Sequence, residues 1–229
     1  MRARRDLRPA PTSLLISVII PVRNGAQTIA RCLEAAFASR GPRFEVIVVD
    51  DASSDGCAEI VRRFPCRLIQ LERHRGAAAA RNAGAARARG ELLFFTDADC
   101  LLREDTLALV CRALGGAGPR SAVGGTYTPG PVDDSFFSRF HSAFIHYAET
   151  KHASEPDYLA THALAIRADA FRREGGFAQG PLPILEDVEF SHRLRRAGFR
   201  LLLDPSIQDR KSTRLNSSHS DRSRMPSSA

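Results

Sequence analysis

The first half of the chain alternates short apolar runs with segments of helical periodicity. The runs are rich in branched side chains and are bounded by turn residues, which is typical of buried strands, and the segments between them repeat apolar residues three or four positions apart. Strands that are apolar on both faces and are linked by helices indicate a parallel sheet with right-handed crossovers. The predicted strands are residues 14–20, 44–50, 66–71 and 91–96, and the predicted helices are 26–39, 55–64 and 76–90.

The second half continues the α/β pattern. Its clearest elements are a strand at 164–167, a helix that starts at Glu186 and ends near Gly198, and a strand at 200–208. Asn24 is the expected N-cap of the first helix, because it directly precedes the helical pattern. A chain of 229 residues with 43% hydrophobic residues can bury a substantial core, so we expect one folded domain.

Charge and cysteine content narrow the class of function. The formal net charge is +7, but +3 of it lies in residues 2–8 and another +3 in residues 209–229, which leaves +1 for the body. A nucleic-acid partner is therefore not expected. The five cysteines are odd in number and form no CxxC pair, so we expect neither a zinc site nor a disulfide framework. No apolar run is long enough to span a membrane, so we expect no transmembrane segment in this sequence. The expected location is cytoplasmic, with the inner face of the membrane as an alternative.

The end of the chain has a composition of its own. Residues 209–229 are rich in Ser and Arg, and residues 209–219, DRKSTRLNSSH, resemble the in-frame translation of a sequencing-library adapter. We therefore expect a basic, disordered N-terminus at 1–12, a folded domain at 13–208 whose natural C-terminal end is missing, and a disordered, non-native tail at 209–229.

Two aspartates follow the fourth predicted strand. Asp97 and Asp99 stand directly after GELLFFT, and the carboxyl ends of parallel strands form the usual ligand edge of such a sheet. Residues two apart in an extended chain point the same way, so the two carboxylates can share one cation. Mg²⁺ commonly takes one or two protein carboxylates together with substrate phosphates. Taken alone, however, such Asp pairs also terminate strands and form turns.

Polar residues also follow the first two strands. The strand 44–50 leads into VVDDASSDG, which places Asp50, Asp51 and Asp55 at the same edge, and the strand 14–20 is followed by Arg23 and Asn24. Each of these residues could serve only in a turn or a helix cap. The coincidence of three strand ends favours a binding site.

Together these segments resemble the family 2 inverting glycosyltransferases, which have the GT-A fold. The resemblance runs from about Ser17 to Gln208. It rests on four stretches in the order of the family: SVIIPVRNGAQTIARCLEAA, VIVVDDASSDG, RGAAAARNAGAARARGELLFFTDAD and GGFAQGPLPILEDVEFSHRLRRAGFR. It implies a Rossmann-like nucleotide-diphospho-sugar transferase fold, in which a mostly parallel sheet carries helices on both faces.

The resemblance also implies roles for individual residues. Asp99, together with Asp97, would hold Mg²⁺ or Mn²⁺, and Asp187, next to Glu186, would be the catalytic base. Thr161-His162-Ala163 stands where the family often has an Asn. His162 could therefore be an acceptor contact, but a lone His is more often structural or merely exposed. The implied donor-binding residues are Pro21, Arg23, Asn24, Asp51, Arg75, Arg81 and Asp97, with Asp51 at the base and Arg75 or Arg81 at the diphosphate.

The reaction implied by the resemblance is a single displacement at the anomeric carbon, with inversion of configuration. The donor would be a nucleotide-diphosphate sugar, usually a UDP-sugar in this family, and the acceptor a carbohydrate or a lipid-linked hydroxyl compound. Two alternatives come from other classes of protein. One is an inactive or truncated relative that only binds sugar nucleotides, and the other is a haloacid-dehalogenase-like phosphatase with Asp97 as nucleophile.

Residues 134–150 carry an aromatic stripe. Phe136, Phe137, Phe140, Phe144 and Tyr147 recur near one face of a predicted helix. A stripe of this kind is most often core, so we expect these side chains to be buried. The alternative is a surface for peripheral membrane association or for a lipid-linked acceptor.

Overall fold

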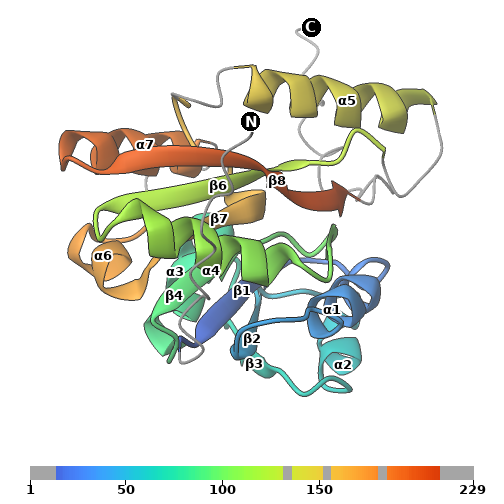
Figure 1. The fold of residues 1–229 in the computed structure, drawn as a ribbon. Helices are drawn as coiled ribbons and strands as arrows, with labels where there is room; N and C mark the ends of the chain where they lie inside the picture. Colours follow the sequence, from blue (N-terminus) through green and yellow to red (C-terminus); the bar gives the residue numbers. More distant parts are fainter. Residues whose placement is uncertain (1–13, 131–135, 152–155, 180–184, 212–229) are drawn as a thin grey trace, which may run out of the picture.

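The computed structural model describes residues 14–130, 136–151, 156–179 and 185–211 (Figure 1). Within these residues, eight strands form one sheet in the order β3-β2-β1-β4-β7-β6-β8-β5. The strands are β1 (Ile16–Val22), β2 (Phe44–Asp50), β3 (Arg67–Gln70), β4 (Leu92–Phe95), β5 (Cys100–Leu102), β6 (Ser121–Tyr127), β7 (Leu164–Arg167) and β8 (Arg200–Lys211). The helices are α1 (Ile29–Phe37), α2 (Cys57–Val61), α3 (Ala77–Arg87), α4 (Thr106–Ala117), α5 (Phe136–Thr150), α6 (Ala168–Arg173) and α7 (Glu186–Arg196), with a 3₁₀ turn, η1 (Thr161–Ala163).

The four strands predicted in the first half of the sequence are confirmed. β2, β1 and β4 lie side by side in parallel, with Val22 opposite Asp50 and Ile19 opposite Phe95, and β3 extends the sheet beside β2. This register brings the carboxyl ends of β1, β2 and β4 to one edge of the sheet. The polar residues that follow these strands therefore gather at that edge.

Beyond β4 the neighbouring strands no longer all run parallel to one another. β7 runs antiparallel to both β4 and β6, β8 runs parallel to β6, and β5 lies antiparallel to β8 at the far edge. Four of the seven neighbouring pairs of strands are parallel, so the sheet is mixed. The first half of the sheet is built from consecutive strand-helix units, whereas the second half joins segments that are far apart in the sequence.

Helices cover both faces of the sheet, as the apolar strands predict. Successive residues of β1 point to opposite sides: Val18 belongs to a buried cluster with residues of α1, α2 and α4, and Ile19 to a cluster with residues of α3, α6 and α7. In the second cluster, the rings of Phe95, Phe171 and Phe177 meet with centroids 5.1 to 5.2 Å apart. Such aromatic contacts contribute roughly 0.5–1.5 kcal/mol per pair beyond the burial of area.

The start of α1 differs from the prediction. The helix begins at Ile29 with Thr28 at the N-cap position, so the assignment of Asn24 as the N-cap is wrong. Asn24 instead adopts a left-handed conformation with φ of 51°, which Asn tolerates better than most residues. Its side chain is used for a contact between loops, described below.

The end of the folded region also differs from the prediction. β8 continues to Lys211, three residues past the expected boundary at Gln208. Residues 209–211 pair with residues 100–102 of β5, and Asp209 is fully buried. Polar composition suggested disorder here, but the hydrogen bonds of a strand are made by the backbone and do not require apolar side chains. The expected disordered segments 1–12 and 212–229 lie outside the described residues.

Helix α5 corrects the expectation that its aromatic stripe is core. Phe140, Phe144 and Tyr147 are 61%, 56% and 66% exposed, and the side chains of Phe136 and Phe137 lie outside the described set. The inner face of the helix is taken by His146 and Glu149, which bond to β6. Among the helices of the described segments, none combines the length and the hydropathy that crossing a membrane requires.

Candidate active site

Asp51 follows β2 at the carboxyl edge and is buried. Its Oδ1 accepts a hydrogen bond from the N–H of Arg75 at 2.7 Å. Its Oδ2 accepts one from the N–H of Gly76 at 2.8 Å and lies 2.7 Å from Nδ1 of His74. The carboxylate therefore fixes the loop between β3 and α3. Both oxygens are engaged in this loop, but a carboxylate oxygen can accept more than one hydrogen bond, so Asp51 keeps the capacity to accept one from a ligand.

The loop after β1 is joined to the loop after β2. The N–H of Asn24 donates to Oγ of Ser53 at 2.9 Å, and Oδ1 of Asn24 accepts from the N–H of Ser54, also at 2.9 Å. The structure thus brings Asn24 next to the segment that follows Asp51, as the positions of these residues at neighbouring strand ends predict.

Three other residues predicted to contact the donor lie at the same carboxyl edge and are more exposed than Asp51. Pro21 is half-buried within β1, and Arg23 is exposed just beyond it. Arg75 is also exposed, and its guanidinium donates to Oε1 of Gln179 at 3.1 Å. Two cationic side chains therefore stand at the open side of this edge.

Arg81 is a buried cation held between two carboxylates. It projects from α3, its side chain is 5% exposed, and its terminal nitrogens donate to Oδ1 of Asp97 and to Oε1 of Glu186, both at 2.7 Å. Charge-assisted hydrogen bonds of this length are strong, and the planar guanidinium fixes both partners. The sequence suggested a diphosphate contact for Arg81. In the structure both terminal nitrogens are engaged, and the residue ties the loop after β4 to the first turn of α7.

Asp97, Asp99 and Cys100 are the one group of metal-ligand type within the described residues, with their ligand atoms all within 4.8 Å of one another. Burial alone would raise the pKa of Asp97, but the charges of Arg81, His162 and Lys211 together outweigh it and hold that pKa below its ordinary value. Burial raises the pKa of Asp99, although the ammonium of Lys211 opposes the shift. Burial also raises the pKa of the Cys100 thiol, which therefore stays protonated.

The chemistry of this group fits a hard divalent cation. Carboxylate oxygens are the ligands that Mg²⁺ and Mn²⁺ prefer, whereas a protonated thiol is a poor ligand for either. The raised pKa of Asp99 also means that its negative charge is not fully compensated by the protein. Asp97 and Asp99 are therefore suitable ligands for the expected ion, with Cys100 as a buried neighbour.

Helix α7 starts with the two acidic residues predicted to be catalytic. Acidic side chains in a first turn interact favourably with the helix dipole, and Glu186 is further held by Arg81. Asp187 is different: its Oδ1 accepts the N–H of Val188 at 2.8 Å, and burial raises its pKa. Leu185, just before the helix, has φ of 93°, a strained conformation for a residue with a side chain. A carboxylate with a raised pKa is suited to accept a proton.

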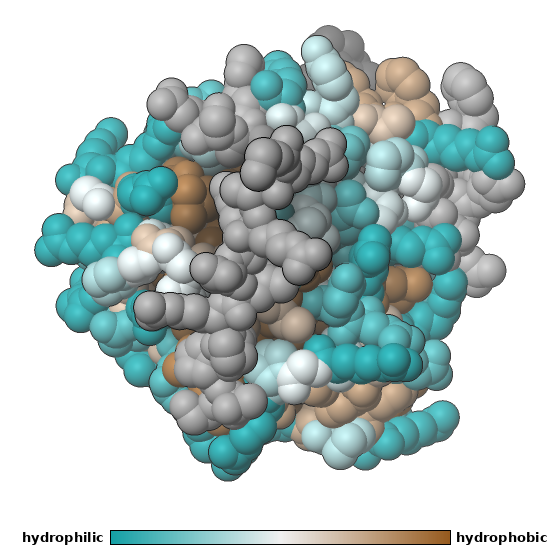
Figure 2. Space-filling view, viewed as in Figure 1, coloured by the Kyte–Doolittle hydropathy of each residue, from teal (hydrophilic) through white to brown (hydrophobic). Residues whose placement is uncertain are grey.

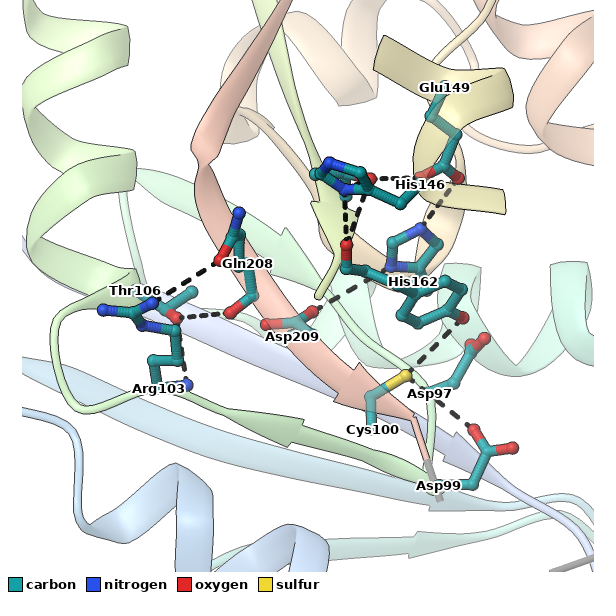
Figure 3. Close-up of polar contacts among 12 residues, drawn as sticks. Asp97, Asp99, Cys100, Arg103, Thr106, His146, Glu149, His162, Gln208 and Asp209 are labelled. Atoms are coloured by element: carbon teal, nitrogen blue, oxygen red, sulfur yellow. Dashed lines mark hydrogen bonds and ion pairs between the residues drawn. The ribbon is translucent and has the colours of Figure 1, made fainter. Parts of the chain in front are cut away.

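A buried cluster centred on His162 lies beside the aspartates (Figure 3). Nε2 of His162 lies 3.1 Å from Oε1 of Glu149, and Nδ1 lies 4.0 Å from Oδ2 of Asp209, an ion-pair distance that is too long for a hydrogen bond. The ring of Tyr127 stacks on the imidazole with centroids 3.8 Å apart. Burial alone would lower the pKa of His162, but Asp209 and Glu149 outweigh it and raise the pKa to about 9. His162 is thus a buried cation, enclosed by protein groups where the sequence suggested an acceptor contact.

The His162 cluster is connected to the aspartate pair. The hydroxyl of Tyr127 lies 3.8 Å from the sulfur of Cys100, and the ammonium of Lys211 lies 5.3 Å from the centre of the Tyr127 ring. Figure 3 shows Asp97, Asp99 and Cys100 on one side of this cluster and Glu149 on the other. Sequence reasoning missed the parts played by Glu149, Asp209 and Lys211. The sequence contained a signal for Glu149 alone, as an acidic residue within the predicted aromatic helix 134–150.

The comparisons with known proteins agree with this fold and show the family of the chain. Residues 17–174 match the family described as Glycosyl transferase family 2, so the chain belongs to this family. Glycosyltransferase AglE of Haloferax volcanii is 31% identical over 195 residues, which cover 81% of this chain and 63% of AglE. Succinoglycan biosynthesis protein ExoO of Rhizobium meliloti is 39% identical over 111 residues, which cover 47% of this chain and 32% of ExoO. The chain therefore spans less than two thirds of the length of these relatives.

Solved structures confirm the predicted GT-A fold. The mannosyltransferase PcManGT from Pyrobaculum calidifontis, in complex with GDP-Man and Mn²⁺, has a TM-score of 0.74 and 26% identity, and the match covers 96% of this chain and 64% of that protein. TarS of S. aureus in complex with UDP-GlcNAc has a TM-score of 0.67 and 22% identity, with 92% and 61% covered. The family assignment favours a transferase over the haloacid-dehalogenase-like phosphatase.

Proposed function

We propose that this chain transfers a sugar from a nucleotide-diphosphate sugar to a hydroxyl group of a carbohydrate or lipid-linked acceptor, with inversion at the anomeric carbon. The observation that carries the proposal is the bridge made by Arg81. It joins Asp97, one of the two candidate metal ligands, to Glu186, the neighbour of the candidate base Asp187. A direct displacement requires donor and acceptor to be held in one fixed geometry, and a buried support shared by both sites favours such a geometry.

On the acceptor side, Asp187 is the proposed general base. Its carboxylate takes the proton of the acceptor hydroxyl while the hydroxyl oxygen forms a bond to the anomeric carbon. The bond from that carbon to the diphosphate oxygen breaks on the opposite face, and the nucleoside diphosphate leaves with the electron pair. A positioned base of this kind contributes roughly 10²- to 10⁴-fold to the rate. The raised pKa of Asp187 supports this role.

On the donor side, Asp97 and Asp99 are the proposed ligands of Mg²⁺ or Mn²⁺. When bound, the ion would offset the negative charge of the departing diphosphate. Asp51 and Asn24 lie in the loops that would receive the nucleoside, and the exposed Arg75 is available to the diphosphate. PcManGT was solved with GDP-Man and TarS with UDP-GlcNAc, so we take UDP as the first candidate and GDP as the second.

Calorimetric titration of UDP and of GDP, each with Mn²⁺, Mg²⁺ or a chelator, tests the donor site. We expect binding of one nucleotide to require the metal ion, to be lost in Asp99→Asn and to persist in Glu104→Gln, which changes an exposed carboxylate paired with Arg40. Binding that is independent of both the metal ion and Asp99 would contradict the proposal. Binding followed by no release of nucleotide with any hydroxyl acceptor would instead favour the inactive, sugar-nucleotide-binding alternative.

A further inference from the structure

Helix α5 turns polar residues toward the protein and aromatic residues away from it. On the inner face, Glu149 accepts a hydrogen bond from the hydroxyl of Thr126 at 2.8 Å and lies 3.1 Å from His162. Nδ1 of His146 lies 2.8 Å from the carbonyl oxygen of Tyr127. These contacts fix the rotation of the helix about its axis. The orientation is the reverse of the usual one, in which a surface helix buries its apolar face and exposes its polar face.

The outer face of α5 presents a continuous aromatic surface. Phe140, Phe144 and Tyr147 are three of the five large hydrophobic side chains that are exposed among the described residues. The rings of Phe140 and Phe144 stack, with centroids 6.2 Å apart and planes inclined by 15°. Figure 2 shows brown, hydrophobic atoms gathered at the upper edge of the molecule, where α5 runs. Grouped apolar side chains of this kind mark interaction sites more often than single ones do.

Cations stand at both ends of this aromatic surface. Arg139 and Lys151 are exposed and lie 12 residues apart, which corresponds to roughly 18 Å along a helix. The acidic residue of the helix, Glu149, has a side chain that is only 10% exposed, because it faces His162. Lys151 follows Tyr147 by four positions and lies on the aromatic side of the helix, whereas Arg139 precedes His146 by seven and lies toward that flank. Positive charge therefore borders the aromatic surface. This combination is typical of helices that lie in the plane of a membrane interface.

We propose that α5 docks on a membrane surface with anionic headgroups and inserts Phe140, Phe144 and Tyr147 at the boundary between headgroups and acyl chains. Arg139 and Lys151 then lie among the headgroup phosphates. The inner face of the helix stays bonded to β6 and η1, so docking requires no rearrangement of the site.

The location of α5 also bears on which class of acceptor the site would use. This inference about the acceptor rests on the proposed function. The segment that follows α5 reaches the helix of the proposed base: the N–H of Leu159 donates to Oγ of Ser191 at 3.0 Å, and Ser191 lies one turn after Asp187 on α7. Figure 1 shows α5 and α7 together in the upper part of the molecule. A docked protein would hold Asp187 close to hydroxyl groups carried at the membrane surface. The acceptor class that this geometry favours is a lipid-linked saccharide.

Co-sedimentation with vesicles tests the docking separately from the activity. Vesicles of phosphatidylglycerol and phosphatidylcholine should pellet the chain more strongly than vesicles of phosphatidylcholine alone. The double variant Phe140→Ser/Phe144→Ser should partition roughly tenfold less onto the mixed vesicles, because it loses two of the inserted rings. The basic segments at both ends of the chain are present in every variant, so their contribution cancels.

Charge variants and oligomeric state complete the test. Lys151→Glu should lower binding to the mixed vesicles, whereas Arg112→Glu, an exposed cation on α4, should not. Circular dichroism should show the same fold for every variant. Equal binding of the double variant and the unmodified chain, or no binding of either, would overturn the proposal. So would a concentration-dependent dimer that the double variant abolishes, since the face would then belong to a second copy of the chain.

Discussion

Arg81 and Glu186 are 105 residues apart in the sequence and 2.7 Å apart in the structure. The other terminal nitrogen of the same guanidinium holds Asp97, also at 2.7 Å. One side chain of α3 therefore sets the relative position of the loop after β4 and the first turn of α7. The two acidic segments cannot shift independently, because each shares this buried cation with the other.

Removal of the bridge should destabilise the protein strongly. Arg81→Met leaves the partly buried carboxylates of Asp97 and Glu186 without their cation, so we expect a loss of about 3 kcal/mol in the free energy of unfolding, measured with urea. Arg62→Met, which breaks an exposed ion pair with Glu59, is the matched control and should cost less than about 1 kcal/mol.

A double-mutant cycle tests whether Arg81 and Glu186 act together even if Arg81→Met alone is poorly stable. In the background of Glu186→Gln, the loss caused by Arg81→Met should be smaller by more than about 1 kcal/mol, because one of the two stranded charges is already gone. A coupling energy close to zero would contradict the bridge.

The pH dependence of transfer should report Asp187. Burial raises its pKa, so the base becomes protonated, and kcat/KM falls on the acid side, at a higher pH than the ordinary aspartate value of about 3.9 would give. Asp187→Asn should lower kcat by roughly 10²- to 10⁴-fold and keep nucleotide binding. Glu189→Gln, on the same helix but paired with Arg193 at the surface, should leave both unchanged. Transfer that persists in Asp187→Asn would rule out the assigned base.

Removal of residues 209–211 should weaken metal binding at the candidate site. Residues 209–211 pair with β5, which starts directly after Asp99. We expect the chain 1–208 to bind Mn²⁺ roughly tenfold more weakly than the chain 1–211, measured by calorimetry, because the support behind the ligands is lost. Replacement of residues 209–211 by three Thr in the chain 1–211 keeps the backbone pairing and separates its effect from that of the side chains. Equal affinity of 1–208 and 1–211 would show that the pairing is irrelevant to the metal site.

The stability that His162 contributes should depend on pH. Its pKa in the folded protein is raised to about 9, above the value of about 6.5 expected in the unfolded chain. Its contribution is therefore fully present below about pH 6.5 and is lost as the pH rises through about 9. The difference in unfolding free energy between the unmodified chain and His162→Gln should be about 3 kcal/mol larger at pH 6 than at pH 10. A difference for His162→Gln that stays constant over this range would argue against a buried cation.

The first half of the fold could be predicted from the sequence because its signals are local. β1, β2 and β4 are apolar segments. A helix follows β1 and β2 directly, and α3 directly precedes β4. The direction of β7 and the position of β8 between β6 and β5 could not be predicted in this way. They depend on pairing between segments far apart in the chain, and alternation of apolar residues does not encode which strands become neighbours.

The contacts of the candidate site could likewise be predicted only where they depend on local sequence. Asp97 and Asp99 could be placed at the ligand edge because they end a strand, but the partner of Arg81 could not be inferred, since Glu186 enters from a distant helix. The periodicity of residues 134–150 correctly indicated a one-sided aromatic helix. It could not indicate which side faces the protein, and the hydrogen bonds of Glu149 and His146 decide that question.

The pairing of β5 with β8 has a consequence for how the protein is made. β5 ends at Leu102, and its partner in the sheet, Asp209, is more than 100 residues further along the chain. Contacts of such long sequence separation form late, because a large loop must close before they contribute. During synthesis the first four strands and their helices can assemble as they leave the ribosome, while the loop that carries Asp97 and Asp99 waits for the last strand. Among the described elements, the edge that carries Asp97 and Asp99 is thus completed after the first four strands, and this part of the chain can be largely folded before the candidate metal ligands have their support.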